Sequence, residues 1–566
     1  MSNAILDRQL FHGISQRRPW FSRTLATGLA IASQLAALLI VGATASAQSN
    51  ERLTFIQPPP DPCFSNQIQL NPQPWPSQNL TVMSEPARLF EAGPSSNPGD
   101  KLRRHRVSDR PLVLIVDGNG FGLSDYDDLA GYLAEKGFNV VVIDRPQDSG
   151  PNPVQQSLSA IAAAFALLGL PADAPVGLIG HSFGGDVVIG ATTENNTNPG
   201  GFNIQSVVLL APKVDDGDST LLGPEQVPAL LAVYGSQDND VGGLDEQLTD
   251  AFSAYDRSGD EGSTTCHNQN PLTCAYKPQM HRSMVYIHGA DHAGLVNQTP
   301  SCSSFGGSST CDPFNNYLAR SDQFCIAKGY TLAMLEWTLD DNDSWKSMVH
   351  GKHVPQSIQN MTTAAADELG NPAGSPPRMA QQVSPKKRSM IENFEDLGWN
   401  IATQTPNVLL QLATEGQFAG GGLNIRHASK FGLLAWPEHD EWQLIGFAVP
   451  FLKSDVTGFT HLAVRLGQLA GVGDPELANS PNSYPSVLIG LHDGASTNWE
   501  WSHSHGDILP ADQRPNGQHQ SVMSTLKIPL TAFHSIDKSA IEAVYLAFPA
   551  GTQGTLLIDS LEWFKE

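Results

Sequence analysis

Short, mainly apolar segments alternate with helix-like segments between residues 111 and 340, and this alternation constrains the fold more than any other feature. The apolar segments are Pro111–Val116, Phe138–Ile143, Val176–Ile179, Gln205–Leu210, Ala229–Tyr234 and Met284–His288. Helical periodicity covers Tyr126–Lys136, Val154–Leu168, Gly185–Thr192 and Ser321–Leu339. Strands that are buried on both faces are apolar throughout, and strands joined through helices run parallel. Residues 109–355 are therefore predicted to form an α/β domain with a doubly wound, mostly parallel sheet.

The pattern changes after residue 389, where helical periodicity nearly disappears. Short β-like segments recur there between turn residues: Trp442–Phe447, His461–Arg465, Ser486–Leu491, Thr525–Ile528, Ala543–Ala547 and Thr555–Ile558. Such a series is typical of an all-β sandwich, which we expect over residues 389–566. Residues 356–388 carry few large apolar side chains and are predicted to be a linker. Residues 48–108 are expected to be an extended lead-in with one or two strands, such as Leu80–Val82.

Residues 1–47 carry an export pattern. Arg17, Arg18 and Arg23 precede an apolar stretch, and small residues follow up to Ala47. This order is that of a secretory signal peptide, with cleavage expected after Ala47, and the adjacent arginines resemble a twin-arginine signal. The alternative is an uncleaved membrane anchor, because the apolar stretch is near the lower length limit for spanning a bilayer. The sequence therefore predicts a secreted or periplasmic protein, membrane-anchored if the leader is retained.

The composition is that of a globular and strongly acidic protein. Hydrophobic residues make up 40% of the chain, charged residues make up 16%, and the formal net charge is −24. Such a charge repels nucleic acids and anionic membrane surfaces, so neither is an expected partner.

The chain has six cysteines, an even number that suits disulfide bonding in an exported protein. Spacing alone does not fix the pairing. The expected pairs are Cys266 with Cys274, Cys302 with Cys311, and Cys63 with Cys325. No Cys-x-x-Cys motif is present, so a zinc site is not expected.

One motif points to nucleophilic chemistry: Gly180-His181-Ser182-Phe183-Gly184-Gly185 matches G-x-S-x-G. In such a nucleophile elbow the serine occupies a strained turn between a strand and a helix, and the flanking glycines permit their close approach. A predicted strand precedes the motif, and a helical pattern follows it. Ser182 is therefore the candidate nucleophile, with Gly180 and Gly184 as the glycines of the elbow.

A serine nucleophile needs a base, and the base needs an orienting acid, which in this kind of site follow the serine in the order acid, then histidine. Asp238 follows the predicted strand Ala229–Tyr234, at the end where the acid belongs. Asp240 is an alternative. Asp215 and Asp216, which follow the preceding strand, are less conventional alternatives.

His292 lies in the loop after the last predicted strand of this domain, where the base belongs. The alternative is an ordinary surface-loop histidine. His288 is expected to pack within the strand. His181, next to the nucleophile, is expected to point away as part of the elbow.

Negative charge that develops on a carbonyl oxygen requires pre-placed N–H donors. The backbone N–H of Phe183, directly after the nucleophile, is the first expected donor. The second is expected from the loop Asp117–Gly122, where Asn119 is the first choice and Gly120 the next. The loop lacks the lysine and the G-x-x-x-x-G-K-[ST] register of a phosphate-binding loop.

The stretch from Leu112 to Asp144, together with the elbow motif, resembles the α/β-hydrolase superfamily, and within it the chlorophyllase, secreted polyester-hydrolase and dienelactone-hydrolase-like groups. The resemblance covers residues 105–345. It implies hydrolysis of carboxylic esters without a metal or cofactor. Asp117 departs from the His or Pro that these groups usually carry there, which puts the detailed loop geometry in question.

The segments at 391–399, 459–465, 528–533 and 558–563 resemble galactose-binding-like jelly rolls found as carbohydrate-binding modules. This resemblance implies an ancillary role in binding a carbohydrate or polymer surface, with a structural calcium near Glu395 and Asp559.

A local cluster consists of Trp499, Trp501, His503 and His505. Aromatic faces stack on flat ligands, and the histidines offer metal ligands. The two-residue alternation favours the other interpretation, an ordinary half-buried strand with packed tryptophans.

Together these observations predict an exported serine hydrolase that cleaves a small-molecule or polymeric ester. The insertions 239–282 and 293–320 contain cysteines and are expected either to border the active site or to brace the domain. The alternatives are a non-catalytic exported binding protein with a degenerate hydrolase unit, and a serine enzyme acting on amide or peptide bonds.

Overall fold

The structure is a computed structural model. It describes residues 77–83, 85–92, 107–144, 152–197, 201–213, 229–235, 281–287, 290–296, 318–351, 353–361, 378–382, 388–392, 394, 401–413, 423–425, 431–468, 487–494, 499–502, 512–513, 519–521 and 524–565. The expected leader at 1–47 lies outside these residues. Within them, no helix is both long enough and apolar enough to cross a membrane.

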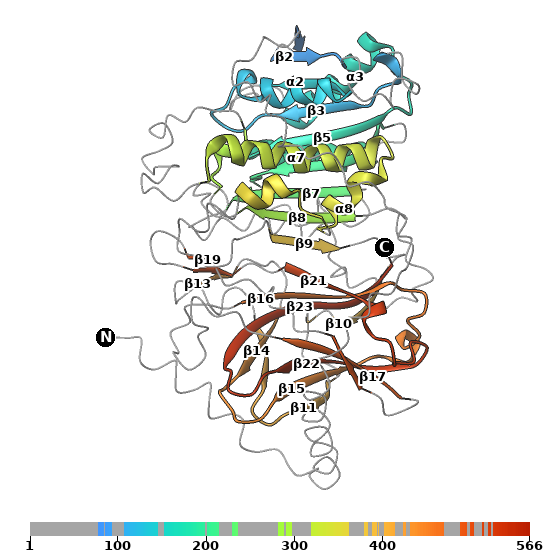
Figure 1. Cartoon of the computed structure of the whole chain (residues 1–566). Coiled ribbons are helices and arrows are strands. Elements are labelled where there is room, and N and C mark those ends of the chain that lie inside the picture. The colour runs from blue at the N-terminus through green and yellow to red at the C-terminus, as the bar shows by residue number, and fades with distance from the viewer. Residues whose placement is uncertain are drawn as a thin grey trace, which may run out of the picture.

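Nine strands of the described chain form one sheet, in the order β1-β2-β4-β3-β5-β6-β7-β8-β9 (Figure 1). They are β1 Gln78–Val82, β2 Glu85–Phe90, β3 Leu112–Val116, β4 Asn139–Ile143, β5 Pro175–His181, β6 Asn203–Leu210, β7 Ala229–Gly235, β8 His281–Ile287 and β9 Arg378–Gln382. Neighbours from β4 to β8 run parallel, while the pairs β1–β2, β2–β4 and β8–β9 run antiparallel. The predicted mostly parallel α/β sheet is confirmed, as is the expectation of strands in the lead-in.

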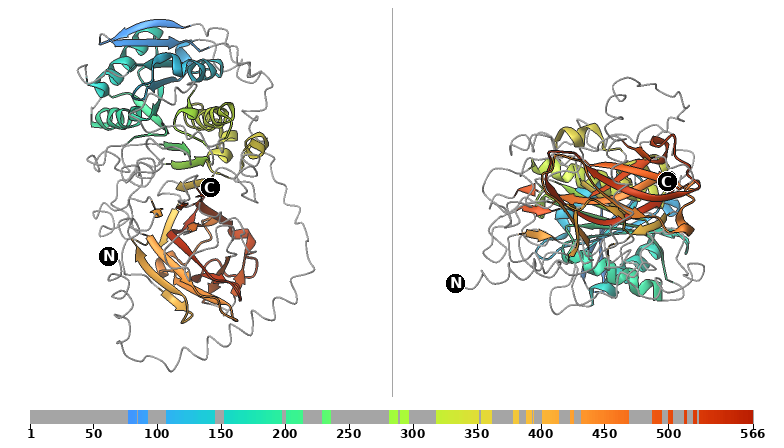
Figure 2. Two further views of the ribbon diagram at one scale, coloured as in Figure 1. Left: turned by 90° about the vertical axis from the view of Figure 1, so that its left-hand side faces the viewer. Right: turned by 90° about the horizontal axis from the view of Figure 1, so that it is seen from below.

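Helices cover both faces of this sheet, as its edge-on view shows (Figure 2, left). They are α2 Asp127–Glu135, α3 Pro153–Leu168, α4 Phe183–Thr197, α7 Arg320–Leu339 and α8 Lys346–Val349. Alternate strand residues face opposite sides. In β3, Val113 and Ile115 pack with α2 and α7 in one core, and Leu112 and Leu114 pack with α3 and α4 in the other. Burial on both sides explains why these strands are apolar at every position.

The local sequence explains the bounds of helix α3. The Asn152 side chain accepts a hydrogen bond from the Val154 N–H at 2.9 Å, and Pro153 occupies the first helical position, where its missing N–H has no cost. Gly169 ends the helix with φ 62°, a left-handed conformation that favours glycine.

The strand order places a topological switch point between β3 and β5. From β3 the chain passes through α2 to β4 on one side, and from β5 it passes through α4 to β6 on the other side. In open α/β sheets, ligands bind at the carboxyl ends of the two strands where the connections diverge. The loops after β3 and β5 therefore meet where a functional site is expected.

The segment predicted to be a linker contributes to the first sheet. Within 356–388, residues Arg378–Gln382 form β9, which pairs antiparallel with β8 at the sheet edge. The linker boundary at 355 therefore needs correction. This strand has no alternating apolar pattern, because it lies at an edge and is held by backbone pairing with β8.

Cys325 lies on α7, is 1% exposed and is disulfide-bonded. The other cysteines lie outside the described residues, so their expected pairing stays a prediction.

The second unit is an antiparallel β-sandwich, as predicted. One sheet has the order β12-β14-β23-β16-β21 with β10 also paired to β23, the other has the order β11-β15-β22-β17-β18, and a small sheet has the order β13-β20-β19. The strands are β10 Arg388–Glu392, β11 Ile401–Gln404, β12 Leu409–Ala413, β13 Leu423–Ile425, β14 Phe431–Trp436, β15 Gln443–Ala448, β16 His461–Gln468, β17 Leu488–Asp493, β18 Trp499–Trp501, β19 Asp512–Gln513, β20 His519–Ser521, β21 Ser524–Pro529, β22 Ile541–Phe548 and β23 Gly554–Phe564.

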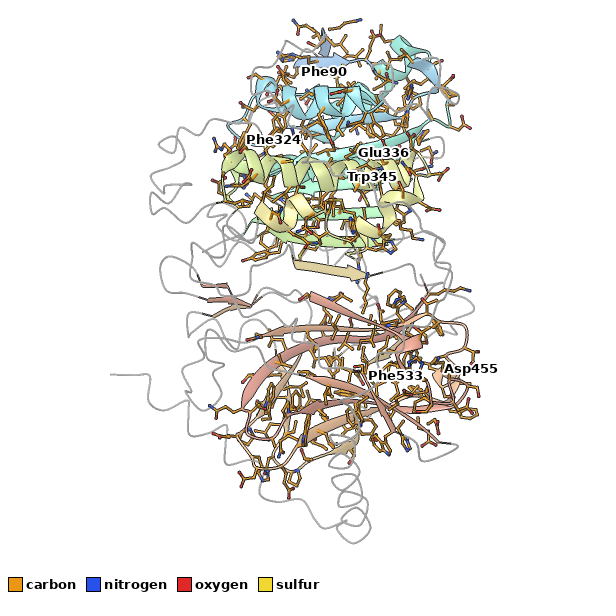
Figure 3. All side chains as sticks on the ribbon, viewed as in Figure 1. Phe90, Phe324, Glu336, Trp345, Asp455 and Phe533 are labelled. Carbon is orange, nitrogen blue, oxygen red and sulfur yellow. The ribbon has the colours of Figure 1, made fainter. Side chains whose placement is uncertain are left out.

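The sandwich core lies between its two large sheets and is dominated by aromatic and branched side chains. Trp436 and Phe548 stack with ring centroids 4.0 Å apart, and Phe533 is fully buried. Phe533 lies inside the sandwich, whereas Asp455 lies at its periphery (Figure 3). This unit therefore has its own hydrophobic core, separate from the two cores of the α/β unit.

A buried ion pair crosses two strands of the sandwich. The Arg465 guanidinium on β16 donates a hydrogen bond to the Asp559 carboxylate on β23, and these residues are 3% and 5% exposed. Arg465 already neutralises this carboxylate, so the residues at Asp559 do not fit the calcium ion expected there. Glu395 lies outside the described residues. Among the residues that are described, no group of three or more His, Cys, Asp or Glu is arranged to hold a metal.

We predict that Asp559→Asn destabilises the sandwich by about 3 kcal/mol, because it leaves a buried guanidinium without its counter-charge. Calorimetric unfolding of the full chain measures the effect. The double variant Arg465→Met, Asp559→Leu should recover most of the loss, and Asp455→Asn at the periphery is the control. Equal effects of Asp559→Asn and Asp455→Asn would contradict the prediction.

Candidate functional site

Ser182 lies at the turn between β5 and α4 with φ 52° and is 1% exposed. Left-handed φ in a residue with a side chain is strained and persists only where the surrounding structure enforces it. Hydrogen bonds fix this turn: the Ser182 N–H donates to the Leu210 carbonyl at 3.1 Å, and its carbonyl accepts from Gly185 and Lys213 at 2.8 Å each. The backbone geometry expected of a nucleophile elbow is therefore present.

The glycines of the motif are required by backbone contacts. A Cβ on Gly184 would lie 2.3 Å from the Val116 carbonyl oxygen, and a Cβ on Gly180 would lie 2.3 Å from the Gly184 carbonyl oxygen. Both separations are far below van der Waals contact, so neither position accepts a larger residue without moving the backbone. The first turn of α4 thus packs directly on the ends of β3 and β5.

The loop after β3 lies against the serine. A Cβ on Gly118 would be 2.8 Å from the Ser182 Cβ, so this loop and Ser182 are in direct contact. The candidate donors Asn119 and Gly120 are exposed, and Gly120 has φ 77°. Phe183 is the first residue of α4, and first-turn amides point out of a helix N-terminus, which also favours negative charge.

His292 is 2% exposed and begins the 3₁₀ turn Ala293–Leu295 after β8. The loop that carries it is anchored to α7 through Gln323. The Gln323 side-chain oxygen accepts from the Asp291 N–H at 2.8 Å, and its nitrogen donates to the Leu318 carbonyl at 2.6 Å. The Asp291 carboxylate accepts from the Gly294 N–H and closes the turn. His292 is therefore a buried residue on an anchored loop, and the surface-loop alternative is wrong.

The end of β7 touches the same loop. A Cβ on Gly235, the last residue of β7, would lie 2.1 Å from the Ala290 carbonyl oxygen. Asp238 follows three residues later along the chain. Asp238, Asp240, Asp215, Asp216 and His288 lie outside the described residues, so their expected roles stay predictions.

His181 makes contacts that the sequence analysis did not anticipate. Its Nδ1 lies 2.9 Å from the Tyr126 hydroxyl, and its Nε2 lies 3.1 Å from the His292 carbonyl oxygen. The His181 and His292 rings are 4.9 Å apart between centroids, and Phe121 packs edge-on against His181 at 4.6 Å. The expectation that His181 merely points away from the site is incomplete, because its ring links two loops of the site.

Tyr126 and Gln323 were missed as site residues. Tyr126 stands in a helical pattern and Gln323 near the start of a mostly apolar helix. The only signal in the sequence is a polar group at a position that helical periodicity places in the core. Tyr126 is fully buried and Gln323 is 1% exposed.

A second candidate site lies on the outer face of the five-stranded sheet of the sandwich. Tyr545 of β22 alternates with core residues, so its ring points away from the sandwich core. The ring centroid of Trp499 lies 4.2 Å from that of Tyr545 and 6.3 Å from that of Trp501. The planes of the two indole rings differ by only 15°. Burial, with a smaller contribution from Glu542, raises the pKa of Tyr545 to about 12, so the phenol stays neutral. We call Trp442, Trp499, Trp501 and Tyr545 the aromatic face.

Two glycines make room for these rings. A Cβ on Gly446 would lie 2.3 Å from the Tyr545 ring, and a Cβ on Gly490 would lie 2.7 Å from the Trp501 ring. Trp499 and Trp501 pack on neighbours, as the strand interpretation expected, yet both stay half-buried on the outside of the sheet. His503 and His505 lie outside the described residues.

Comparisons with known proteins give matches to solved structures. A search of protein-family models found no match, and neither did a search of curated proteins. The C-terminal sandwich is similar to a family 11 carbohydrate-binding module from Clostridium thermocellum in complex with a β-1,3-1,4-mixed-linked tetrasaccharide, at 11% identity and a TM-score of 0.22. That match covers 32% of this chain and 96% of the module. The family 11 module of a cellulosomal cellulase from Clostridium thermocellum also matches, at 10% identity and a TM-score of 0.22. This match covers 32% of this chain and 95% of the module. Similarity at this level carries no functional argument for the chain.

We predict that Gln323→Leu speeds amide exchange at Asp291 and Gly294, because it removes the acceptor that anchors the His292 loop. Hydrogen exchange read by mass spectrometry measures this, and protection in β7 should stay unchanged. Gln156→Leu is the matched control: this glutamine is also fully buried, but it lies on α3 and bonds the Asp144 carbonyl. Equal exchange at Asp291 in both variants would show that Gln323 does not anchor the loop.

Proposed function

We propose that the chain is an exported serine hydrolase that cleaves carboxylic esters through an acyl-enzyme intermediate. The observation that carries the proposal is the left-handed Ser182 at the switch point, which lies against the Gly118 loop, while the neighbouring His181 contacts the anchored loop of His292. The loops that follow β3, β5 and β8 would then supply the oxyanion donors, the nucleophile and the base.

In the proposed reaction, the Ser182 hydroxyl attacks the ester carbonyl carbon while His292 takes its proton. Backbone N–H groups of Phe183 and of Asn119 or Gly120 stabilise the oxyanion. His292 then protonates the leaving alcohol, and a water molecule activated by the same histidine releases the acid from Ser182. Asp238 orients His292, and its position after β7, which contacts the His292 loop through Gly235, supports this role. The chemistry requires no metal or cofactor.

The proposed export rests on the leader pattern at residues 1–47, and the disulfide at Cys325 supports it. Disulfides persist outside the reducing cytoplasm. The net charge of −24 disfavours nucleic acids as partners.

For the sandwich we propose an ancillary role in binding a carbohydrate or a polymer surface. The aromatic face supports this role, because half-buried Trp499 and Trp501 present nearly parallel ring planes to the outside of a rigid sheet. Aromatic faces offer apolar area for stacking on the flat faces of sugar rings or polymers. The domain would hold the hydrolase near an insoluble substrate and raise its local concentration.

A non-catalytic binding protein with a degenerate hydrolase unit is the alternative from another class. The strained φ of Ser182 and the buried, anchored His292 argue against it, because strain of this kind is maintained at functional sites. A serine enzyme acting on amides shares the same machinery, and matched ester and amide substrates distinguish the two activities.

We predict that Ser182→Ala abolishes labelling by a fluorophosphonate and lowers p-nitrophenyl ester turnover by a factor of about 10⁴ or more, since the nucleophile is lost. Mass-spectrometric mapping of the adduct identifies the labelled residue. Ser206→Ala is the matched control, because Ser206 is also a fully buried serine but lies within the neighbouring strand β6. Full turnover in Ser182→Ala would rule out the proposed reaction.

We predict that Trp499→Ala combined with Trp501→Ala weakens retention on insoluble polysaccharides about tenfold, because two stacking surfaces are lost. Ester turnover on a soluble substrate should not change. The control is Phe451→Ser with Leu452→Ser, which removes side chains that are 89% and 95% exposed and lie outside the aromatic face. If only the control loses retention, adsorption is a general effect of exposed apolar side chains.

A further inference from the structure

Three buried hydrogen bonds link the loop after β3 to the loop after β8. The Gly118 N–H donates to the Tyr126 hydroxyl at 2.9 Å, the hydroxyl lies 2.9 Å from His181 Nδ1, and His181 Nε2 lies 3.1 Å from the His292 carbonyl oxygen. Gly118 belongs to the proposed oxyanion loop, and His292 is the proposed base. Tyr126 and His181 are each completely buried. The series therefore runs from one part of the proposed reaction machinery to another through two side chains that are closed off from solvent.

The chemistry of the atoms fixes the direction of each bond. A carbonyl oxygen only accepts, so His181 Nε2 carries the hydrogen that it donates to His292. In the neutral imidazole, Nδ1 is then an acceptor and takes the proton of the Tyr126 hydroxyl. That hydroxyl accepts from the Gly118 N–H at the same time. All donors and acceptors along the series match when His181 is neutral.

Packing allows little movement of these groups. A Cβ on Gly118 would lie 3.0 Å from His181 Nδ1 and 3.1 Å from the Phe121 ring, so the loop is closed against both side chains. Phe121 packs edge-on against His181 at 4.6 Å and lies 6.1 Å from the His292 ring. The His181 ring is therefore enclosed between the two loops.

We propose that Tyr126 and His181 are positioning residues that set the oxyanion loop and the His292 loop in register with Ser182. This inference rests on the proposed function. A shift of one loop relative to the other would misplace the donors or the base with respect to the same reacting carbonyl. Displacements on the order of 1 Å cost enzymes about a hundredfold in rate. The His in the motif Gly180–Gly184 thus has a role of its own, separate from the strand-to-helix turn.

The experiment measures kcat and KM for p-nitrophenyl acetate with the full chain, and the rate of fluorophosphonate labelling at Ser182. Tyr126→Phe removes only the hydroxyl that joins Gly118 to His181. We expect kcat to fall between about 10-fold and 100-fold, with KM changed less than about twofold, because the substrate still binds but the reacting groups are misaligned. Tyr330→Phe is the matched control, since Tyr330 is also a fully buried tyrosine of this domain but lies on α7.

Two further variants separate positioning from packing. Glutamine places a donor near the position of His181 Nε2, so His181→Gln should retain more kcat than His181→Leu. The double variant Tyr126→Phe, His181→Leu should lose little more than His181→Leu alone, because the series acts as a unit. Melting temperatures of all variants show whether a loss of kcat merely follows a loss of folded protein.

The outcomes distinguish the two proposals. Absence of label and turnover in the unaltered chain overturns the proposed function and this inference with it. An active unaltered chain in which Tyr126→Phe and His181→Leu have the kcat of Tyr330→Phe overturns the positioning role alone. Independent, additive losses in the double variant overturn it as well.

Discussion

The backbones of β3, β5 and α4 meet more closely at the serine turn than any side chain permits, and the rest of the candidate active site depends on this contact. Gly184 packs on the Val116 carbonyl, Gly180 packs on Gly184, and Ser182 between them is held in a left-handed conformation. The contact directs the serine toward the switch point of the sheet, where the loop after β3 lies against it. The end of β7 adjoins the loop after β8 through Gly235, and Gln323 secures that loop to α7.

The sequence predicts those parts of the molecule that steric or solvation limits impose on one segment at a time. Strands buried on both faces must be apolar throughout, and the elbow requires glycine at Gly180 and Gly184, so both were recognisable. Tyr126 and Gln323 were not, because their importance comes from partners that are 55 and 32 positions away in the chain, His181 and Asp291. The strand β9 was missed for a similar reason, since it depends on the exposed edge of β8 rather than on its own composition.

Both units bury paired polar groups, but they differ in where their aromatic rings lie. In the α/β unit, polar side chains such as His181 and Tyr126 are buried, and each of their bonds must be made because an unpaired buried group costs free energy. In the sandwich, Arg465 and Asp559 are buried as a pair, while Trp499 and Trp501 remain partly in contact with solvent. Buried polar groups fix the geometry of the first unit, whereas the second presents accessible aromatic rings on the outside of its sheet.

Strand β9 belongs by sequence to the connection between the units and by pairing to the sheet of the first. It also lies beside β21, the edge strand of the sandwich, and the Lys527 side chain of β21 donates to the His350 carbonyl of the first unit (Figure 1). An α/β unit shortened to end at residue 355 would lack β9 and leave this edge of β8 unpaired, including its apolar part Met284–Ile287. Open edges of this kind recruit strands from other molecules. The connection thus covers an edge of the first sheet, and a boundary drawn from sequence alone would leave that edge open.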